Sequence, residues 1–244
     1  MATPRKIKCL VERLIDHGDH VFTVDLKPES RMPRFAPGQF LHLALDAYDP
    51  TSFWPESRVF SIASSTQDRE RLRISYSVQG SFTKRMEAEL CEGREVWTKL
   101  PYGDFVVRDD ADVVLFAGGT GMTAYTSFIE SLNSDFGRDV LLAYGARYDR
   151  LLIYKDSVLS RAAELPCLMA RFFVEEGVVA SDCDNEGVSF EKGRLCVDSI
   201  WPELTDPHAK AYYISGPPAM ISSLKKQLHD KGIDAASIHI DAWE

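Results

Sequence analysis

Cysteine is scarce and shows no pairing pattern in this chain of 244 residues. The five cysteines are odd in number and form no C-x-x-C pair: Cys9, Cys91, Cys167, Cys183 and Cys196. A disulfide framework uses an even, closely spaced set, and a plant-type iron–sulfur cluster needs C-x₄-C-x₂-C with a further distant cysteine. We therefore expect reduced thiols and neither an iron–sulfur cluster nor another metal site.

The sequence also lacks a long apolar run and a basic cluster interleaved with aromatic residues. A membrane-spanning helix needs about 18 or more consecutive apolar residues, and nucleic-acid binding needs a basic surface. The net charge is instead −9. Glu12, Asp16 and Asp19 interrupt any signal-peptide core after the basic N-terminus. We expect no membrane span, no nucleic-acid partner and a cytoplasmic location.

The first half of the chain has the alternating residue pattern of β strands. Apolar and polar residues alternate over 40–45 and 72–78, and Gly, Pro and Asp turns separate the short segments. This pattern is typical of an antiparallel barrel. One helix is predicted over 83–90, where Phe82, Met86 and Leu90 repeat at a spacing of four.

The second half alternates apolar strands with helical patterns, which indicates a parallel sheet. Helices are predicted from Thr123 to about residue 133 and over 218–231. The predicted strands are Val113–Ala117, Val140–Tyr144, Cys167–Val174, Ala211–Ile214 and Ser237–Ile240. The acidic turn from Arg108 to Asp112 separates the β-rich pattern from the alternating strand–helix pattern, so we place the domains at 1–108 and 109–244.

The most informative stretch is the glycine loop that follows the strand at 113–117. Gly119, Gly121 and Ala124 fit the form G-x-G-x-x-A that opens dinucleotide-binding helices. Glycines let the backbone approach a ligand closely, and free amides at a helix start favour a diphosphate. A glycine turn that binds no ligand is the alternative.

Polar or glycine-rich segments follow all five predicted strands of the second half. They are Gly118–Gly121, Tyr144–Arg147, Val174–Gly177, Ser215–Pro218 and Asp241–Trp243. In parallel sheets, ligands bind beyond the carboxyl ends of the strands. This edge is therefore the predicted nucleotide site.

Two further motifs flank the glycine loop. Arg58-Val-Phe-Ser-Ile-Ala-Ser64 is followed about twenty residues later by Gly80-Ser-Phe-Thr83, and Tyr213-Ile-Ser-Gly-Pro-Pro-Ala-Met220 lies near the C-terminus. In this order the motifs resemble those of the ferredoxin–NADP reductase-like flavoproteins, which read R-x-[YF]-S, G-x-x-[ST], G-G-T-G-x-[TS] and C-G-P-x-x-M. The resemblance covers almost the whole chain. It implies two domains, an antiparallel β-barrel flavin domain followed by an α/β parallel-sheet nucleotide-binding domain.

The resemblance also assigns flavin contacts. It places Phe60 on the flavin ring, Ser61 as a donor to N5, and Arg58 on the phosphate as a guanidinium fork. The remaining flavin-binding candidates are Tyr76, Gly80, Ser81, Phe82, Thr83 and Trp243. Because the helix start at 80–83 offers a second anion site, FAD is favoured over FMN. The alternative is an ordinary strand with a core Phe and a surface Arg.

The nicotinamide nucleotide is expected on the second half. Its candidate contacts are Gly118, Gly119, Thr120, Gly121, Thr123, Arg147, Glu175, Ser215, Gly216, Pro217 and Met220. Ser215 stands where the family has cysteine, and by resemblance a serine there still fits against the nicotinamide C4. A glycine-proline helix start without a ligand is the alternative.

The C-terminal Asp241-Ala-Trp243 matches the acid-x-aromatic ending of plant-type relatives, displaced inward by one residue. By resemblance, Trp243 shields the flavin until nicotinamide displaces it, and Asp241 polarises the reacting edge. With Ser61 and Ser215, these two residues complete the predicted catalytic set. A terminal Trp packed as a structural residue is the alternative.

The choice between NADH and NADPH rests on charge. Relatives hold the 2′-phosphate of NADPH with a Ser-Arg pair, where this chain has Glu175-Glu176. Carboxylates repel a phosphate and accept from a ribose hydroxyl, whereas Arg147 indicates the opposite preference. We weight the glutamates more and expect NADH.

The predicted function is hydride transfer from NAD(P)H to FAD, with electrons passed to a separate acceptor such as a ferredoxin or an oxygenase component. A reductase of free flavin or ferric chelates is one alternative. A non-catalytic flavin-binding electron-transfer subunit of a larger complex is the other. The sequence leaves open the acceptor, the physiological direction and the oligomeric state.

Overall fold

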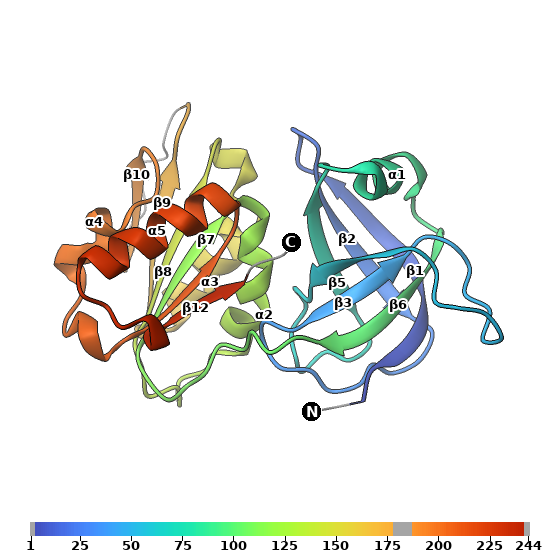
Figure 1. The fold of residues 1–244 in the computed structure, drawn as a ribbon, viewed down its shortest axis with the longest axis horizontal. Coiled ribbons are helices and arrows are strands. Elements are labelled where there is room, and N and C mark those ends of the chain that lie inside the picture. Colours follow the sequence, from blue (N-terminus) through green and yellow to red (C-terminus); the bar gives the residue numbers. More distant parts are fainter. Residues whose placement is uncertain (1–2, 178–186, 242–244) are drawn as a thin grey trace. The chain divides into compact units, whose positions relative to one another are not determined.

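The computed structural model describes residues 3–177 and 187–241. It divides into two units, each with its own sheet (Figure 1). The first unit comprises Met1–Val106 with Thr126–Ser131, and the second comprises Val107–Tyr125 with Leu132–Glu244. The main division, at Val106, lies close to the predicted boundary at residue 108.

The first unit is a six-stranded antiparallel sheet that curls into a near-barrel. Its spatial order is β4-β3-β6-β1-β2-β5. The Ala63 N–H, just past β4, donates to the Arg73 carbonyl of β5 at 2.9 Å and links the two edge strands. The predicted antiparallel architecture is confirmed. The strands are β1 (Arg5–Asp16), β2 (Val21–Pro28), β3 (Phe40–Ala44), β4 (Ser57–Ser61), β5 (Leu72–Ser77) and β6 (Glu95–Tyr102).

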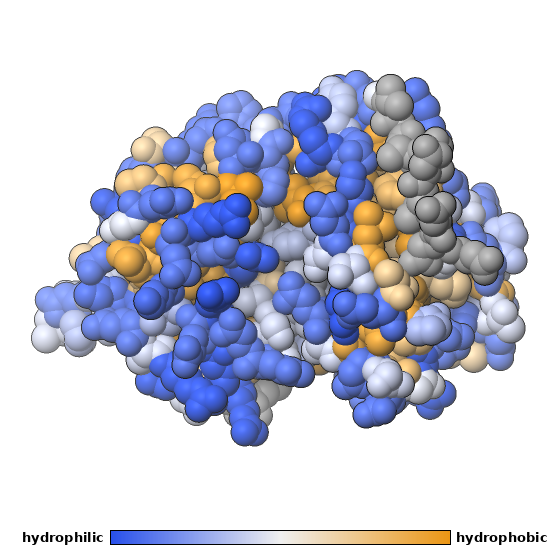
Figure 2. All heavy atoms as spheres, turned by 180° about the vertical axis from the view of Figure 1, so that it is seen from behind, coloured by the Kyte–Doolittle hydropathy of each residue, from blue (hydrophilic) through white to orange (hydrophobic). Residues whose placement is uncertain are grey.

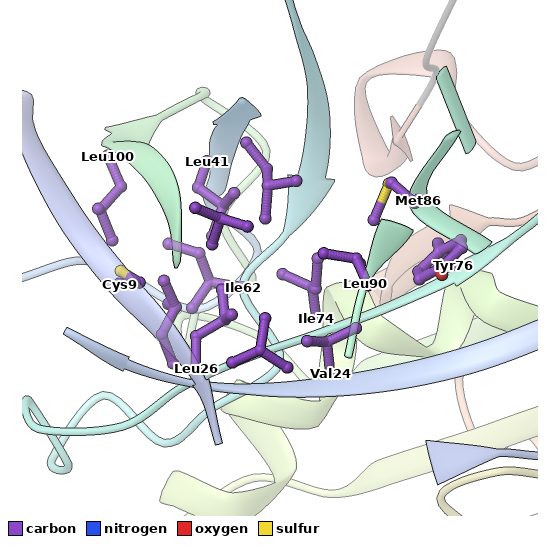
Figure 3. Close-up of a cluster of buried hydrophobic side chains, with 14 of the residues drawn as sticks. Cys9, Val24, Leu26, Leu41, Ile62, Ile74, Tyr76, Met86, Leu90 and Leu100 are labelled. Carbon is purple, nitrogen blue, oxygen red and sulfur yellow. The ribbon is translucent and has the colours of Figure 1, made fainter. Parts of the chain in front are cut away.

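The near-barrel is filled by apolar side chains from alternate strand positions (Figure 3). Leu41, Leu72 and Ile74 are fully buried, in agreement with the alternation read in the sequence. Helix α1 (Ser81–Glu89) buries Phe82 and Met86 against the same cluster. The spacing of four in that segment therefore marks the buried side of the helix.

The second unit is a six-stranded parallel sheet in the order β10-β9-β8-β7-β11-β12. The strands are β7 (Val113–Gly118), β8 (Val140–Ala146), β9 (Leu168–Val174), β10 (Val188–Lys192), β11 (Ala211–Ser215) and β12 (Ile238–Asp241). The helices are α2 (Thr123–Ser131), α3 (Lys155–Glu164), α4 (Val197–Ile200) and α5 (Pro218–Asp230). All five predicted strands are present. Strand β10 was not predicted, and the helices expected between the strands had been given no bounds at α3 and α4.

The order of this sheet creates a switch point. From β7 the chain adds β8, β9 and β10 on one side, then returns to place β11 on the other side of β7. The connections that follow β7 and β11 therefore run toward opposite edges of the sheet, and ligands bind at such a point in sheets of this kind. All six residues of β7 are buried, as expected for a central strand.

Hydrophilic residues cover most of the face shown in Figure 2, and hydrophobic residues show in patches between them. Phe53 is the most exposed large apolar side chain in the described chain, at 98%. No helix within 3–177 or 187–241 combines the length and apolar character that crossing a bilayer requires.

Candidate functional site

Strand β4 carries the first motif. Arg58 pairs across the ladder with Leu43, and Ser61 pairs with Phe40. Arg58 and Phe60 are two residues apart, so they project from the same side of the strand. The Arg58 side chain is about half exposed, whereas Ser61 is buried. The Arg58 guanidinium, which donates to the Ser57 carbonyl at 3.0 Å, is thus accessible to a ligand phosphate, and Ser61 is the last residue of the strand.

Aromatic rings form a connected set around Phe60. The Phe60 ring meets Tyr76 edge-on, with centroids 6.1 Å apart, and Tyr76 stacks on Phe22 at 5.4 Å. The Arg58 guanidinium lies over the Phe82 ring, 5.5 Å from its centroid. Tyr76, a member of this set and a predicted flavin contact, is almost fully buried.

Two buried hydroxyls in this region lack a hydrogen-bond partner among the described residues. They belong to Tyr76 and Ser64, and burial raises the pKa of the Tyr76 phenol well above its ordinary value. Buried polar groups without partners are rare in folded proteins, so such groups indicate a missing ligand or water. A flavin, which carries many hydrogen-bonding atoms on its ring and ribityl chain, fits this environment.

The start of helix α1 offers backbone amides. The Thr83 hydroxyl oxygen accepts from the Gln79 and Gly80 N–H groups at 2.9 and 3.1 Å, which fixes the turn into the helix. The amides of Ser81, Phe82 and Thr83 come next and have no acceptor within the helix. A Cβ at Gly80 would meet nothing within 4 Å, so the space above this turn is open. These features suit a diphosphate.

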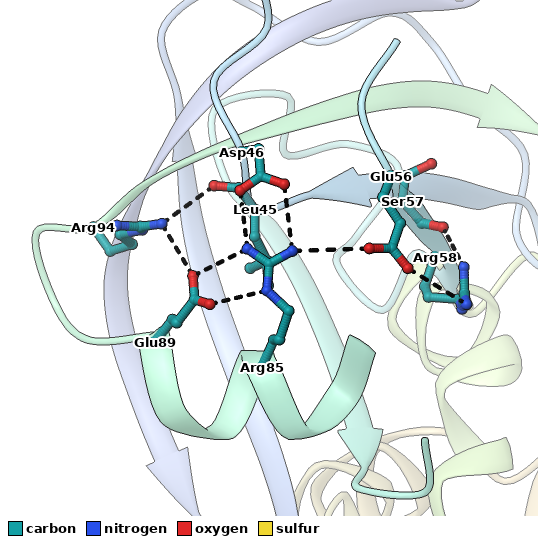
Figure 4. Close-up of polar contacts among 8 residues, drawn as sticks. All are labelled: Leu45, Asp46, Glu56, Ser57, Arg58, Arg85, Glu89 and Arg94. Carbon is teal, nitrogen blue, oxygen red and sulfur yellow. Dashed lines mark hydrogen bonds and ion pairs between the residues drawn. The ribbon is translucent and has the colours of Figure 1, made fainter. Parts of the chain in front are cut away.

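A network of charged side chains centred on Arg85 extends to Arg58 at one end (Figure 4). Glu56 lies 3.8 Å from both Arg58 and Arg85. Arg85, on α1, also binds Asp46 at 2.9 Å and Glu89 at 2.9 Å. The Arg85 hydrogen bonds hold the pKa of the Asp46 carboxyl below its usual range. Arg85 thus joins the helix to the loop that leads into β4.

In the second unit, the glycine loop packs directly on the turn after β11. A Cβ at Gly121 would lie 2.4 Å from the Ser215 carbonyl oxygen, and one at Gly118 would lie 2.6 Å from the Met220 sulfur. Gly119 has φ +52°, and its Cβ position is open. Two of these glycines therefore permit close packing of the two motifs, while Gly119 faces free space.

Ser215 and Asp241 form a buried pair at adjacent strand ends. The Ser215 hydroxyl donates to Asp241 Oδ2 at 3.0 Å, and both side chains are less than 5% exposed. The strands β11 and β12 place these residues opposite each other in register. Thr123, at the start of α2, donates its hydroxyl to the Thr120 carbonyl at 2.8 Å. The structure thus brings together the predicted residues of the glycine loop, Ser215 and Asp241.

The edge at β8 and β9 carries paired charges. Arg147 donates to Glu176 at 2.9 Å, and Tyr148 donates to the same carboxylate at 3.2 Å. These bonds hold the pKa of Glu176 below its usual range. Glu175 accepts from Arg194 at 3.0 Å. Glu176 and Arg147, which indicated opposite cofactor preferences, are therefore bonded to each other.

Sequence reasoning missed several residues at these sites. Ser64 was quoted within the first motif without a role, and Glu56, Arg85 and Arg194 were not considered. A lone Glu or Arg has no local signal, because its partner lies far away in the sequence. Trp243 lies outside the described residues.

Metal ligands and disulfides are absent from the part of the chain that the structure describes. No group of three His, Cys, Asp or Glu side chains is arranged there to hold a metal ion. The described cysteines are free, with Cys9 buried and Cys91 exposed.

Comparison with known proteins finds a family model that matches the second half and relatives that match most of the chain. The model of the oxidoreductase NAD-binding domain family matches residues 115–226. A flavohemoprotein from Bordetella pertussis is 27% identical over 220 residues, covering 86% of this chain and 53% of that protein. The ferredoxin reductase component of 3-ketosteroid-9-alpha-monooxygenase from Mycobacterium tuberculosis is 32% identical over 218 residues, covering 88% of this chain and 56% of that protein. The chain spans about half the length of these relatives.

Among solved structures, the flavohem-like FAD/NAD-binding domain of nitric oxide dioxygenase from Vibrio cholerae has the same fold. The TM-score is 0.78 at 20% identity, and the match covers 97% of this chain and 98% of that one. The solved structure shows the fold. The sequence matches and the motifs identify the chain as a ferredoxin–NADP reductase-like FAD- and NAD(P)-binding module, homologous to NAD(P)H-dependent flavoprotein reductases.

Proposed function

We propose that this chain transfers hydride from a reduced nicotinamide nucleotide to FAD and passes the electrons to a separate acceptor, a ferredoxin or an oxygenase component. The observation that carries the proposal is the pair of half-sites, one around Arg58 and the start of α1, the other around the glycine loop and Ser215. The Mycobacterium tuberculosis relative is named as a ferredoxin reductase component of a monooxygenase, which supports this class of acceptor.

On the flavin side, we assign Arg58 and the amides of 81–83 to the FAD diphosphate. Phe60 packs against the ring, and Ser61 donates a hydrogen bond to its reducible edge. Bound FAD would supply a centre that accepts hydride and releases single electrons. The residues of this chain supply binding, orientation and exclusion of water.

On the nucleotide side, we assign the glycine loop to the diphosphate and place Thr123 and Ser215 near the nicotinamide. Asp241 holds the Ser215 hydroxyl at 3.0 Å and orients it. The ending Asp241-x-Trp243 supports a role for Trp243 in covering the flavin, by resemblance to relatives.

NADH is the proposed nucleotide. The Glu176 carboxylate is held ionised by Arg147 and Tyr148, so a 2′-phosphate would meet a negative charge and an arginine that is already engaged. A ribose hydroxyl, in contrast, can donate to such a carboxylate.

The experiment is an absorbance spectrum of the purified protein, identification of the released flavin, and NADH or NADPH oxidation with ferricyanide as acceptor. FAD that remains bound after desalting, with NADH-dependent ferricyanide reduction, is the expected result. Flavin lost on desalting, with rapid reduction of added free flavin, would favour the free-flavin reductase. Bound flavin without oxidation of either nucleotide would favour a non-catalytic subunit.

A further inference from the structure

Arg58, the proposed phosphate-binding arginine, has a carboxylate beside it. Glu56 Oε1 lies 3.8 Å from Arg58 Nη2, and the two side chains are each about half exposed. An ionised carboxylate at this distance attracts the guanidinium and repels a phosphate that approaches it. By itself, Glu56 would therefore oppose anion binding at Arg58.

A second arginine binds the other oxygen of the same carboxylate. Arg85 Nη1 lies 3.8 Å from Glu56 Oε2, and Figure 4 draws this contact as a dashed line. Arg85 is held in place by a two-pronged contact with Asp46 and by Glu89 one turn further along α1. Its position is thus fixed by groups other than Glu56, so it can act on Glu56 as a stationary positive charge.

We propose that Arg85 is a positioning residue for flavin binding, which shares the Glu56 carboxylate with Arg58, at 3.8 Å from each arginine, and so weakens the hold of Glu56 on the Arg58 guanidinium that binds the FAD diphosphate. The inference rests on the proposed function, because it needs Arg58 to contact the phosphate. It adds two residues, Glu56 and Arg85, that lie outside the four family motifs. Arg85 acts through Glu56 and need not touch the cofactor.

Restraint of Glu56 by Arg85 predicts a different result for FAD binding than direct attraction of the diphosphate by the Arg85 charge. If Arg85 acts by restraining Glu56, its removal weakens FAD binding only while Glu56 is charged. If Arg85 instead attracts the diphosphate from a distance, its removal weakens FAD binding equally with Glu56 or with Gln at that position. A double-mutant cycle separates the two.

The test measures the dissociation constant of FAD at low ionic strength for the full chain and for Arg85→Gln, Glu56→Gln and the double variant. We expect Arg85→Gln to bind FAD about two- to fivefold more weakly, the size of an exposed ion-pair effect. Glu56→Gln should bind FAD as well as the original chain or better. The double variant should match Glu56→Gln.

Arg94→Gln is the matched control. Arg94 binds Glu89 at 3.3 Å in the same network and carries the same charge, and the ion pairs of the described chain do not join it to Glu56. The Arg94→Gln variant should leave FAD affinity unchanged. Arg85→Lys keeps the charge and should retain most of the affinity, and apoprotein melting temperatures check that each variant is folded.

The inference is overturned if the double variant binds FAD as weakly as Arg85→Gln, if Glu56→Gln itself weakens binding, or if Arg94→Gln matches Arg85→Gln. Failure of the proposed function looks different. In that case the original chain does not bind FAD, or Arg58→Ala binds it unchanged.

Discussion

The contact between the glycine loop and the turn after β11 makes Gly121→Ala an informative perturbation. The new Cβ would lie 2.4 Å from the Ser215 carbonyl oxygen, 2.6 Å from its carbonyl carbon and 2.7 Å from the Gly216 Cα. All three atoms belong to backbone, so no side chain can rotate to make room. The loop and the turn have to separate by about 1 Å to reach an ordinary contact distance.

Overpacking of this kind costs about 1–3 kcal/mol of folding free energy. We expect Gly121→Ala to lower the free energy of unfolding in urea by that amount and to weaken NADH binding, because the displaced turn carries Ser215 and its bond to Asp241. The assays are urea unfolding followed by fluorescence and an NADH titration. A folded variant that binds NADH less well would show that the contact matters for the site beyond stability.

Gly137→Ala is the matched control for this substitution. Its Cβ would meet nothing within 4 Å, and its φ is not in the left-handed region. Removing backbone freedom at such a site stabilises a protein by about 0.4–1 kcal/mol. If Gly121→Ala equals this control in both unfolding and NADH affinity, the close approach of the glycine loop to Ser215 is refuted.

Four further predictions address the assigned residues. Arg58→Ala should weaken FAD binding by about 1.5–3 kcal/mol, the range of a charge-assisted hydrogen bond, and unchanged affinity in a flavin titration would remove Arg58 from the site. Replacing Glu175 with Ser and Glu176 with Arg should shift kcat/KM toward NADPH, and a clear NADPH preference in the original chain would contradict the NADH proposal. Trp243→Ser should tighten binding of oxidised nicotinamide cofactor by about 0.5–1.5 kcal/mol if the indole stacks where nicotinamide must lie. Asp241→Asn should slow flavin reduction in stopped flow with little effect on nucleotide affinity, whereas an equal loss of both would indicate a structural role.

Much of the second unit was readable from the sequence. The strand at 113–117 is a continuous apolar run because β7 is buried on both faces, and the glycines after it mark the turn into α2. In contrast, β10 was missed because Val188–Lys192 is short, partly polar and at the edge of the sheet. A local sequence pattern indicates which residues are buried, and an edge strand such as β10 has few fully buried residues.

The sequence by itself determined the alternating core positions, the two kinds of sheet and the chain positions of the four motifs. These features are local, since each follows from the period of apolar residues or from glycine at a turn. Only the tertiary structure decided which charges meet. Arg194 pairs with Glu175, and Arg85 with Asp46 and Glu56, across 19, 39 and 29 positions of the chain, respectively. No local pattern encodes such pairs, because an ion pair depends on which strand ends and helix faces the fold brings within a few ångströms of each other.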